Sequence, residues 1–160
     1  MRIETPLLVL GGGPAGLVAA KIAGACGQPC LLVGHEIISG NTPVELDKTS
    51  IGVLEEYGLI DVLRPHLLAA HPLTIVPCDF EHVLKRHCVA DLNVGVYDRF
   101  ELIDRAVRGR ILHGVLSDGR SRWELVADTW IDAGALAVSL PAAISDGAAA
   151  VLRAIRAPRC

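Results

Sequence analysis

Three glycines near the amino terminus carry the clearest chemistry in the sequence. Gly11, Gly13 and Gly16 follow the apolar run of residues 7–10 and lead into the alanine-rich stretch 17–26. This pattern predicts a buried strand, a glycine turn and a tightly packed helix. In such a turn the first glycine permits the bend, the second lets a pyrophosphate approach the backbone, and the third lets the helix pack on the strand. The turn therefore predicts a dinucleotide site, and a glycine turn without a ligand is the alternative.

The elements after the turn predict a βαβ unit that is followed by helices. Residues 27–29 end the first helix, and the apolar residues 30–33 predict a second, parallel strand. Thr42 and Glu45 have the spacing of a capping box, which predicts a helix from residue 43 to residue 57 that stops at Gly58. The other elements predicted here are a helix at 61–70, a short strand at 73–76, and a helix at 80–88 capped by Asp79.

From residue 91 onward the pattern changes to extended structure. Leu92, Val94 and Val96 recur with a period of two, which predicts a strand. Asp118 and Gly119 are the preferred pair for a tight hairpin turn. Further strands are predicted at 100–107, 110–116, 122–127 and 129–132, and a last, alanine-rich helix runs from Pro141 to about residue 156.

The glycine turn also carries a family resemblance. Its form is Gly-x-Gly-Pro-Ala-Gly, with Pro14 and Ala15 before the last glycine, and this form is common in FAD proteins. The chain resembles, over nearly its whole length, the FAD domain of the glutathione-reductase-like flavoproteins, which include thioredoxin reductases, aromatic hydroxylases and geranylgeranyl-reductase-like proteins. The resemblance implies an α/β, Rossmann-like FAD-binding domain whose parallel sheet has helices on one face and a three-stranded β-meander on the other. It also implies that residues 1–160 form a single FAD-binding domain.

The resemblance assigns roles in FAD binding to positions along the whole chain. It places the pyrophosphate on residues 11–16, the adenine at the backbone of Phe100, and the flavin ring between residues 39–43 and the start of the last helix. The positions implied for FAD are Gly11, Gly13, Pro14, Ala15, Gly16, Glu36, Asn41, Thr42, Phe100, Ala133, Gly134, Asp146 and Gly147. No catalytic residue and no metal ligand is assigned.

The chain departs from the family pattern at three points. The acidic residue expected to bind the adenosine ribose falls on Gly34, so we assign this role to Glu36, and a solvated loop glutamate is the alternative. The family's Ala-Thr-Gly element is one residue short at Ala133-Gly134, and Asp132 replaces part of it. The Gly-Asp that precedes the ribityl chain in relatives is not recognisable after Gly134.

Composition excludes several classes of function. Hydrophobic residues make up 51% of the chain, yet no apolar run reaches the ~18 to 20 residues of a membrane span. The net charge of −3 gives no reason to expect a nucleic-acid partner. The five cysteines are an odd number without CxxC spacing and follow no signal peptide, which favours a cytoplasmic protein with reduced thiols.

Charged and histidine side chains outside the turn form no catalytic pattern. The six histidines show no metal-like spacing. Arginines of the predicted meander alternate with Asp104 and Asp118, which is typical of a solvated β face, and anion binding is the alternative; they are Arg105, Arg108, Arg110, Arg120 and Arg122.

The sequence resembles an FAD domain, but no NAD(P)H or substrate domain is recognised in it. This combination leads to two functional hypotheses. The first is a minimal single-domain flavoprotein that holds or sequesters FAD, or delivers it to a partner flavoenzyme or reductase. The alternative is an FAD-dependent oxidoreductase component whose other half comes from a partner or a second copy. A homodimer is compatible with both. A degenerate domain that binds no flavin is a third possibility.

Overall fold

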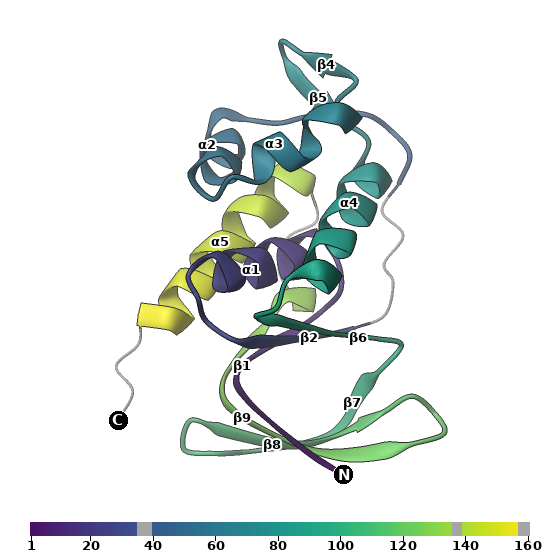
Figure 1. Ribbon diagram of the computed structural model, residues 1–160, viewed down its shortest axis with the longest axis vertical. Coiled ribbons are helices and arrows are strands. Elements are labelled where there is room, and N and C mark those ends of the chain that lie inside the picture. Colours follow the sequence, from purple (N-terminus) through teal and green to yellow (C-terminus); the bar gives the residue numbers. More distant parts are fainter. Residues whose placement is uncertain (35–39, 136–138, 157–160) are drawn as a thin grey trace.

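A computed structural model describes residues 1–34, 40–135 and 139–156, and its centre is a six-stranded mixed sheet (Figure 1). The strand order is β6-β2-β1-β9-β8-β7. The first four strands are parallel, and β8 and β7 continue the sheet antiparallel. The strands are β1 (Arg2–Leu10), β2 (Cys30–Gly34), β6 (Val94–Asp98), β7 (Glu101–Arg108), β8 (Ile111–Ser117) and β9 (Arg122–Asp132).

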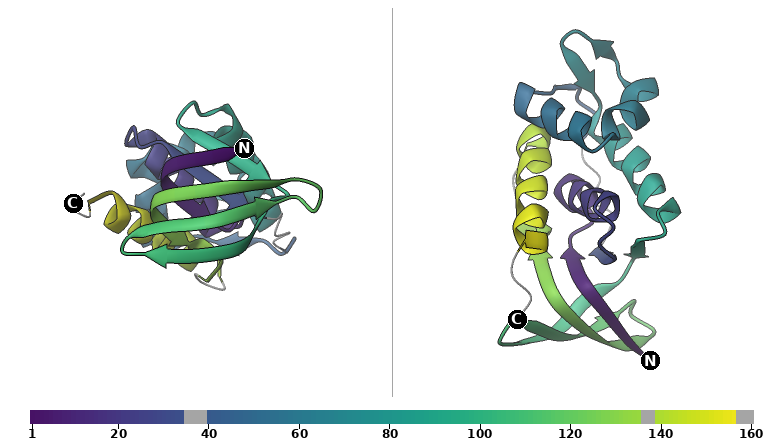
Figure 2. Two further views of the ribbon diagram at one scale, coloured as in Figure 1. Left: turned by 90° about the horizontal axis from the view of Figure 1, so that it is seen from below. Right: turned by 60° about the vertical axis from the view of Figure 1, so that its left-hand side comes forward.

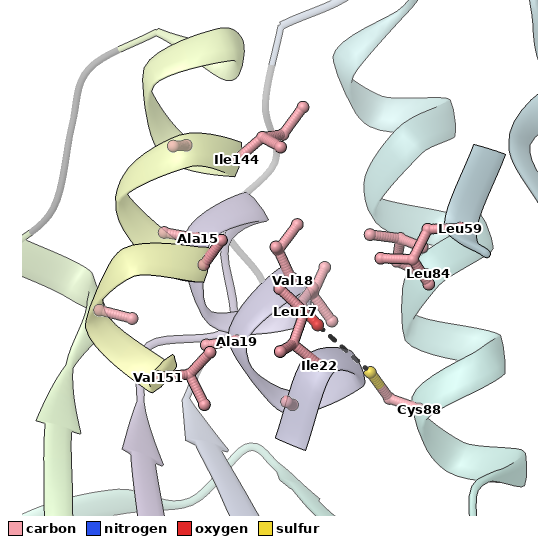
Figure 3. Packing of buried hydrophobic residues seen from close by; sticks show 14 of the residues in the cluster. Ala15, Leu17, Val18, Ala19, Ile22, Leu59, Leu84, Cys88, Ile144 and Val151 are labelled. Carbon is pink, nitrogen blue, oxygen red and sulfur yellow. Dashed lines mark hydrogen bonds between the residues drawn. The ribbon is translucent and has the colours of Figure 1, made fainter. Parts of the chain in front are cut away.

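Three helices cover one face of the parallel strands. They are α1 (Pro14–Ala25), α4 (Pro77–Ala90) and α5 (Leu140–Arg156). Small residues let α1 lie close to α5, because a Cβ on Gly147 would overlap the carbonyl oxygen of Ala15. Leu17, Val18 and Ile22 of α1 are fully buried between the two neighbouring helices (Figure 3). This apolar layer fixes α1, and with it the glycine turn from which α1 starts.

The other face of the parallel strands packs against the meander formed by β7, β8 and β9. Leu8, Leu31 and Val33 of the parallel strands form a second core with Leu112 and Leu116 of β8. In the view from below, the meander lies in front and the helices lie behind it (Figure 2, left). The expected α/β architecture, with helices on one face and a three-stranded meander on the other, is confirmed. The meander shares its last strand with the parallel sheet.

The region between β2 and α4 differs most from the sequence prediction. The helix predicted from residue 43 is wrong at its start, since Val44 and Glu45 form strand β3 (Val44–Glu45) and pair with Ile75 and Thr74 of β5 (Leu73–Ile75). The helix α2 (Lys48–Glu56) begins later, and Asp47 caps it by accepting a hydrogen bond from the Ser50 N–H at 2.7 Å. With β4 (Ala69–Ala70), these strands form a small antiparallel sheet that the sequence did not suggest.

Three other element predictions also need correction. The helix predicted at 61–70 is a short α3 (Leu59–Leu63), a 3-10 turn η1 (Arg64–His66) and then β4. The helix predicted at 80–88 begins earlier, at Pro77, with Val76 rather than Asp79 at its N-cap. The strands predicted at 122–127 and 129–132 form one strand, β9, because its pairing with β1 continues past Asp128.

No helix in the described part of the chain is long and apolar enough to cross a membrane. Among the described cysteines, Cys30 and Cys88 are buried free thiols and Cys26 is an exposed one.

Candidate functional site

The glycine turn lies at the carboxyl end of β1, between β2 and the segment that follows β9. The Gly11 N–H donates to the Val33 carbonyl oxygen at 2.7 Å. Gly11 has a φ of +112°, which favours glycine, and a Cβ there would lie 2.6 Å from the Gly134 nitrogen. The turn can therefore close only with a glycine at this position.

Helix α1 begins at this turn without a side-chain cap. Gly13 is the N-cap residue and Pro14 opens the first turn, which contains no acidic residue. The first N–H groups of a helix have no partner within the helix, and the dipole places partial positive charge there. The start of α1 is therefore suited to an anion.

Two further glycines are required by close packing around the turn. A Cβ on Gly16 would overlap the carbonyl oxygen of Gly11, so the third glycine permits the contact between helix and turn. Gly34, at the end of β2, lies so close that its Cβ would be 2.5 Å from the Gly12 nitrogen. This contact explains why Gly34 stands at the position where an acidic residue was expected.

A pocket of about 510 Å³ opens beside the turn at the carboxyl ends of the parallel strands. Its sheet side is formed by Leu10, Gly11, Val33, Gly34 and Asp132, and its other side by residues 100–105. Ligands of open α/β sheets bind at this edge of the sheet. The structure thus brings two of the residues assigned from the resemblance, Gly11 and Phe100, to one pocket.

An aromatic cluster fixes Phe100 at the end of this pocket. The Phe100 ring lies 4.7 Å from the Trp123 ring and 5.4 Å from the Tyr97 ring, measured between centroids. The cluster joins the end of β6 to the start of β9, so the backbone that enters β7 has a defined position.

The other assigned positions are distributed around the turn and the helices. Ala133 is buried, and Gly134 abuts Gly11. Asn41, Thr42 and Asp146 are exposed and do not line this pocket. Gly147 lies inside α5, where it packs on Ala15 of α1. Glu36, assigned to the ribose, lies outside the described residues.

Among the pocket residues that were not assigned from the sequence, Asp132 and Arg105 carry opposite charges and lie close together. Asp132 ends β9 directly opposite Leu10 of β1, and Arg105 of β7 lies with its Nη1 3.9 Å from Asp132 Oδ2. Asp132 is the last residue of the strand predicted at 129–132, but its place opposite Leu10 depends on the register with β1, which no local pattern reports. The place of Arg105 depends on how the meander folds over the sheet, and no local pattern reports that.

In the described residues no group of three His, Cys, Asp or Glu side chains could hold a metal ion.

Comparison with known proteins identifies the fold but no sequence relative. No family model matches the chain, and no curated protein matches it. Among solved structures, the flavin-dependent monooxygenase PieE, solved with FAD and substrate, superposes with a TM-score of 0.70 at 18% identity over 80% of this chain and 30% of that chain. The p-nitrophenol 4-monooxygenase PnpA from Pseudomonas putida DLL-E4 gives a TM-score of 0.67 at 18% identity, covering 81% of this chain and 40% of that chain. A flavoprotein/dehydrogenase from Cytophaga hutchinsonii gives 0.63 at 19% identity, covering 82% and 39%.

These superpositions define the class of fold. The chain shares its Rossmann-like α/β fold with part of each of these proteins, of which PieE was solved with FAD bound. It spans between 30% and 40% of the length of the three solved proteins named above.

Proposed function

We propose that this chain binds FAD, with the pyrophosphate on residues 11–16 and the adenine at the backbone of Phe100. The observation that carries this proposal is an uncapped helix start that follows a glycine turn, and the first glycine of that turn lines the same pocket as Phe100. The fold shared with flavin-dependent monooxygenases supports FAD over a nicotinamide dinucleotide. When bound, FAD would supply the redox chemistry.

The chain's own residues would act by positioning the cofactor. Gly11, Gly16 and Gly34 let three backbone segments meet closely enough for the turn to form, and the start of α1 would then donate its free N–H groups to the phosphates. The assignment of Glu36 to the ribose stays part of this proposal. So does a flavin ring between residues 39–43 and the start of α5, which includes Asn41, Thr42 and Asp146.

We infer further that the domain of residues 1–160 holds or sequesters FAD, without an NAD(P)H site of its own. In the described residues and in the sequence, one glycine-rich nucleotide turn is present. The second candidate is an oxidoreductase component completed by a partner reductase or a second copy. The likeness in fold to two monooxygenases, PnpA and PieE, favours this candidate. A cytoplasmic homodimer is the setting that we propose for either function.

The experiment is an absorbance spectrum of the purified protein after incubation with FAD and removal of free flavin, followed by anaerobic NADH and NADPH. Retained flavin absorbance that neither nucleotide bleaches supports a holding role. Bleaching only after a reductase is added supports the second candidate. Rapid bleaching by NADH alone contradicts the absence of an NAD(P)H site, and loss of all flavin contradicts FAD binding.

A further inference from the structure

Arg105 of β7 lines the same pocket as Gly11 of the glycine turn. Its guanidinium carbon lies 5.9 Å from the centre of the Trp130 ring, and its Nη1 lies 3.9 Å from Asp132 Oδ2. Asp132 Oδ1 lies 3.5 Å from the point where a Cβ on Gly134 would stand, and the Gly134 backbone abuts Gly11. These contacts connect the guanidinium, through Asp132 and Gly134, to Gly11, and Gly11 and Arg105 line the same pocket.

The charged residues that line the pocket make Arg105 important for the binding of an anion. Three carboxylates line it, on Glu101, Asp104 and Asp132, and among the described lining residues Arg105 is the one cation. A diphosphate that entered would meet a net negative wall, and a cation within a few ångströms offsets that repulsion more than a distant one does. An anionic ligand in this pocket would therefore have Arg105 as its one cationic partner among the described lining residues.

We propose that Arg105 is a cofactor-binding residue that contacts the pyrophosphate of the dinucleotide from the β7 side of the pocket. This inference rests on the proposed function. An arginine suits the role because its planar guanidinium can donate two parallel hydrogen bonds to a phosphate. The Trp130 ring and Asp132 hold the guanidinium in place before the ligand arrives, which lowers the entropy lost on binding.

The exposure of Arg105 argues against a large contribution of its ion pair to stability. The side chain of Arg105 is 54% exposed and that of Asp132 is 42% exposed. Exposed ion pairs of this kind contribute little to the free energy of unfolding. Removing the Arg105 charge should therefore leave the fold intact and change ligand binding alone.

The test compares R105Q and R105K with R108Q, a matched loss of charge on the same strand at a residue that does not line the pocket. Direct titration gives the Kd for FAD, and displacement gives the Kd for ADP, which carries the diphosphate, and for adenosine, which lacks it. We expect R105Q to raise the Kd for FAD and for ADP about tenfold, because one partly exposed hydrogen bond to a charged group is lost. The Kd values of R105K should lie between those of R105Q and the wild type, while those of R108Q should match the wild type. Adenosine affinity should not change in any variant.

Each other result overturns a different statement. Wild-type FAD affinity in R105Q overturns the role of Arg105 and leaves FAD binding standing. Equal weakening of ADP and adenosine overturns the contact with the diphosphate. A wild-type protein that binds neither FAD nor ADP overturns the proposed function and the role of Arg105 with it.

Discussion

The glycines around the turn serve two separable purposes. Gly11, Gly16 and Gly34 are required by contacts within the protein, since a Cβ at each would meet backbone atoms of the turn or of the segment next to it. Gly13 differs, because its φ of −79° and ψ of −173° are accessible to any residue. The backbone conformation of Gly13 therefore does not itself require a glycine, and the cofactor site supplies a separate reason for one.

We expect Gly13→Val to lower FAD affinity by roughly a hundredfold, because the side chain would stand where the pyrophosphate approaches the backbone. Gly13 is buried, so the melting temperature without ligand is measured together with the affinity, and a variant that keeps the wild-type value tests the cofactor site. Gly16→Val is the contrasting variant, and it should lower the melting temperature because its side chain would overlap Gly11. Unchanged FAD affinity in a folded Gly13→Val protein would place the pyrophosphate elsewhere.

Two buried cysteine thiols should make the free energy of unfolding depend on pH in the alkaline range. Burial raises the pKa of Cys30 and of Cys88 to about 12, from an ordinary value of 9.0. Between about pH 9 and pH 12 the unfolded chain therefore loses thiol protons that the folded chain keeps, so stability falls as pH rises through this window. Each thiol adds at most about 1.4 kcal/mol per pH unit to that slope.

The measurement is the free energy of unfolding from denaturant titrations between pH 8 and pH 11. Cys30→Ala and Cys88→Ala should each make the decline with pH shallower than in the wild type. Cys26→Ala is the control, since this thiol is exposed and its removal should leave the slope unchanged. If all three variants showed the same decline of the free energy of unfolding with pH as the wild type, Cys30 and Cys88 would not be buried as described.

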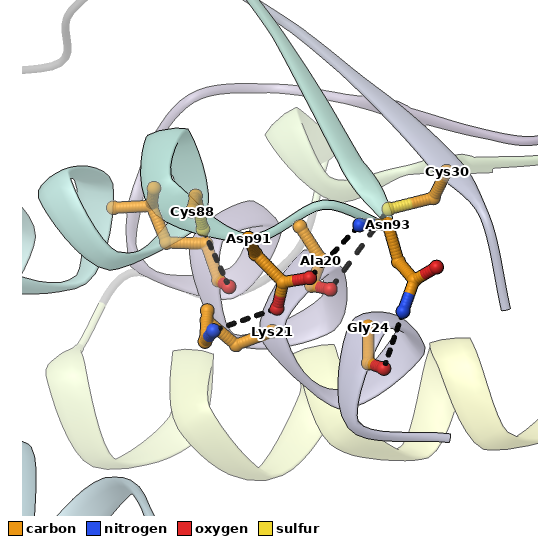
Figure 4. Close-up of polar contacts among 8 residues, drawn as sticks. Ala20, Lys21, Gly24, Cys30, Cys88, Asp91 and Asn93 are labelled. Atoms are coloured by element: carbon orange, nitrogen blue, oxygen red, sulfur yellow. Dashed lines mark hydrogen bonds and ion pairs between the residues drawn. The ribbon is translucent and has the colours of Figure 1, made fainter. Parts of the chain in front are cut away.

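At the scale of elements, the contact between α1 and the end of α4 depends on one shielded ion pair. Lys21 Nζ lies 2.8 Å from Asp91 Oδ2, and both side chains are about 15% exposed (Figure 4). Burial alone would raise the pKa of Asp91, but hydrogen bonds from Lys21 and from the Asn93 N–H lower it below its ordinary value. The stabilisation by this carboxylate is therefore present above pH 4 and is lost as pH falls through the lowered pKa.

Lys21→Met should lower the free energy of unfolding by about 2 kcal/mol, because it leaves a shielded carboxylate without its cation. Arg64→Met is the matched control, since Arg64 pairs with Asp61 at the exposed surface. We expect that change to stay within about 0.5 kcal/mol. Chemical denaturation at pH 7 measures both, and equal effects would argue against the role of the Lys21 pair.

Local sequence patterns predicted the elements that local contacts determine. The first βαβ unit, the Asp118-Gly119 hairpin and the last helix form where residue periodicity and turn residues indicate them. The capping-box prediction at Thr42 failed because Val44 pairs with Ile75, and sequence spacing does not report such distant pairing. Asp132 was not assigned for the same reason, since its place in the pocket follows from its register with Leu10 of β1.

At the scale of the whole molecule, two apolar cores meet at the parallel strands and leave their carboxyl edge open. The helices bury one face and the meander buries the other, so the edge between the turn and β7 is where a ligand can enter. The sequence resemblance suggested a dinucleotide at this edge, and the chain shares its fold with part of two monooxygenases, one of them solved with FAD. The roles of the individual residues remain predictions of the proposal.

The most direct test is a titration of the purified chain with FAD, followed by flavin fluorescence, with ADP as competitor. The account predicts saturable binding of one FAD per chain, displaced by ADP because both diphosphates occupy the turn at residues 11–16. A folded protein that binds no FAD, or one whose bound FAD is not displaced by excess ADP, would contradict it.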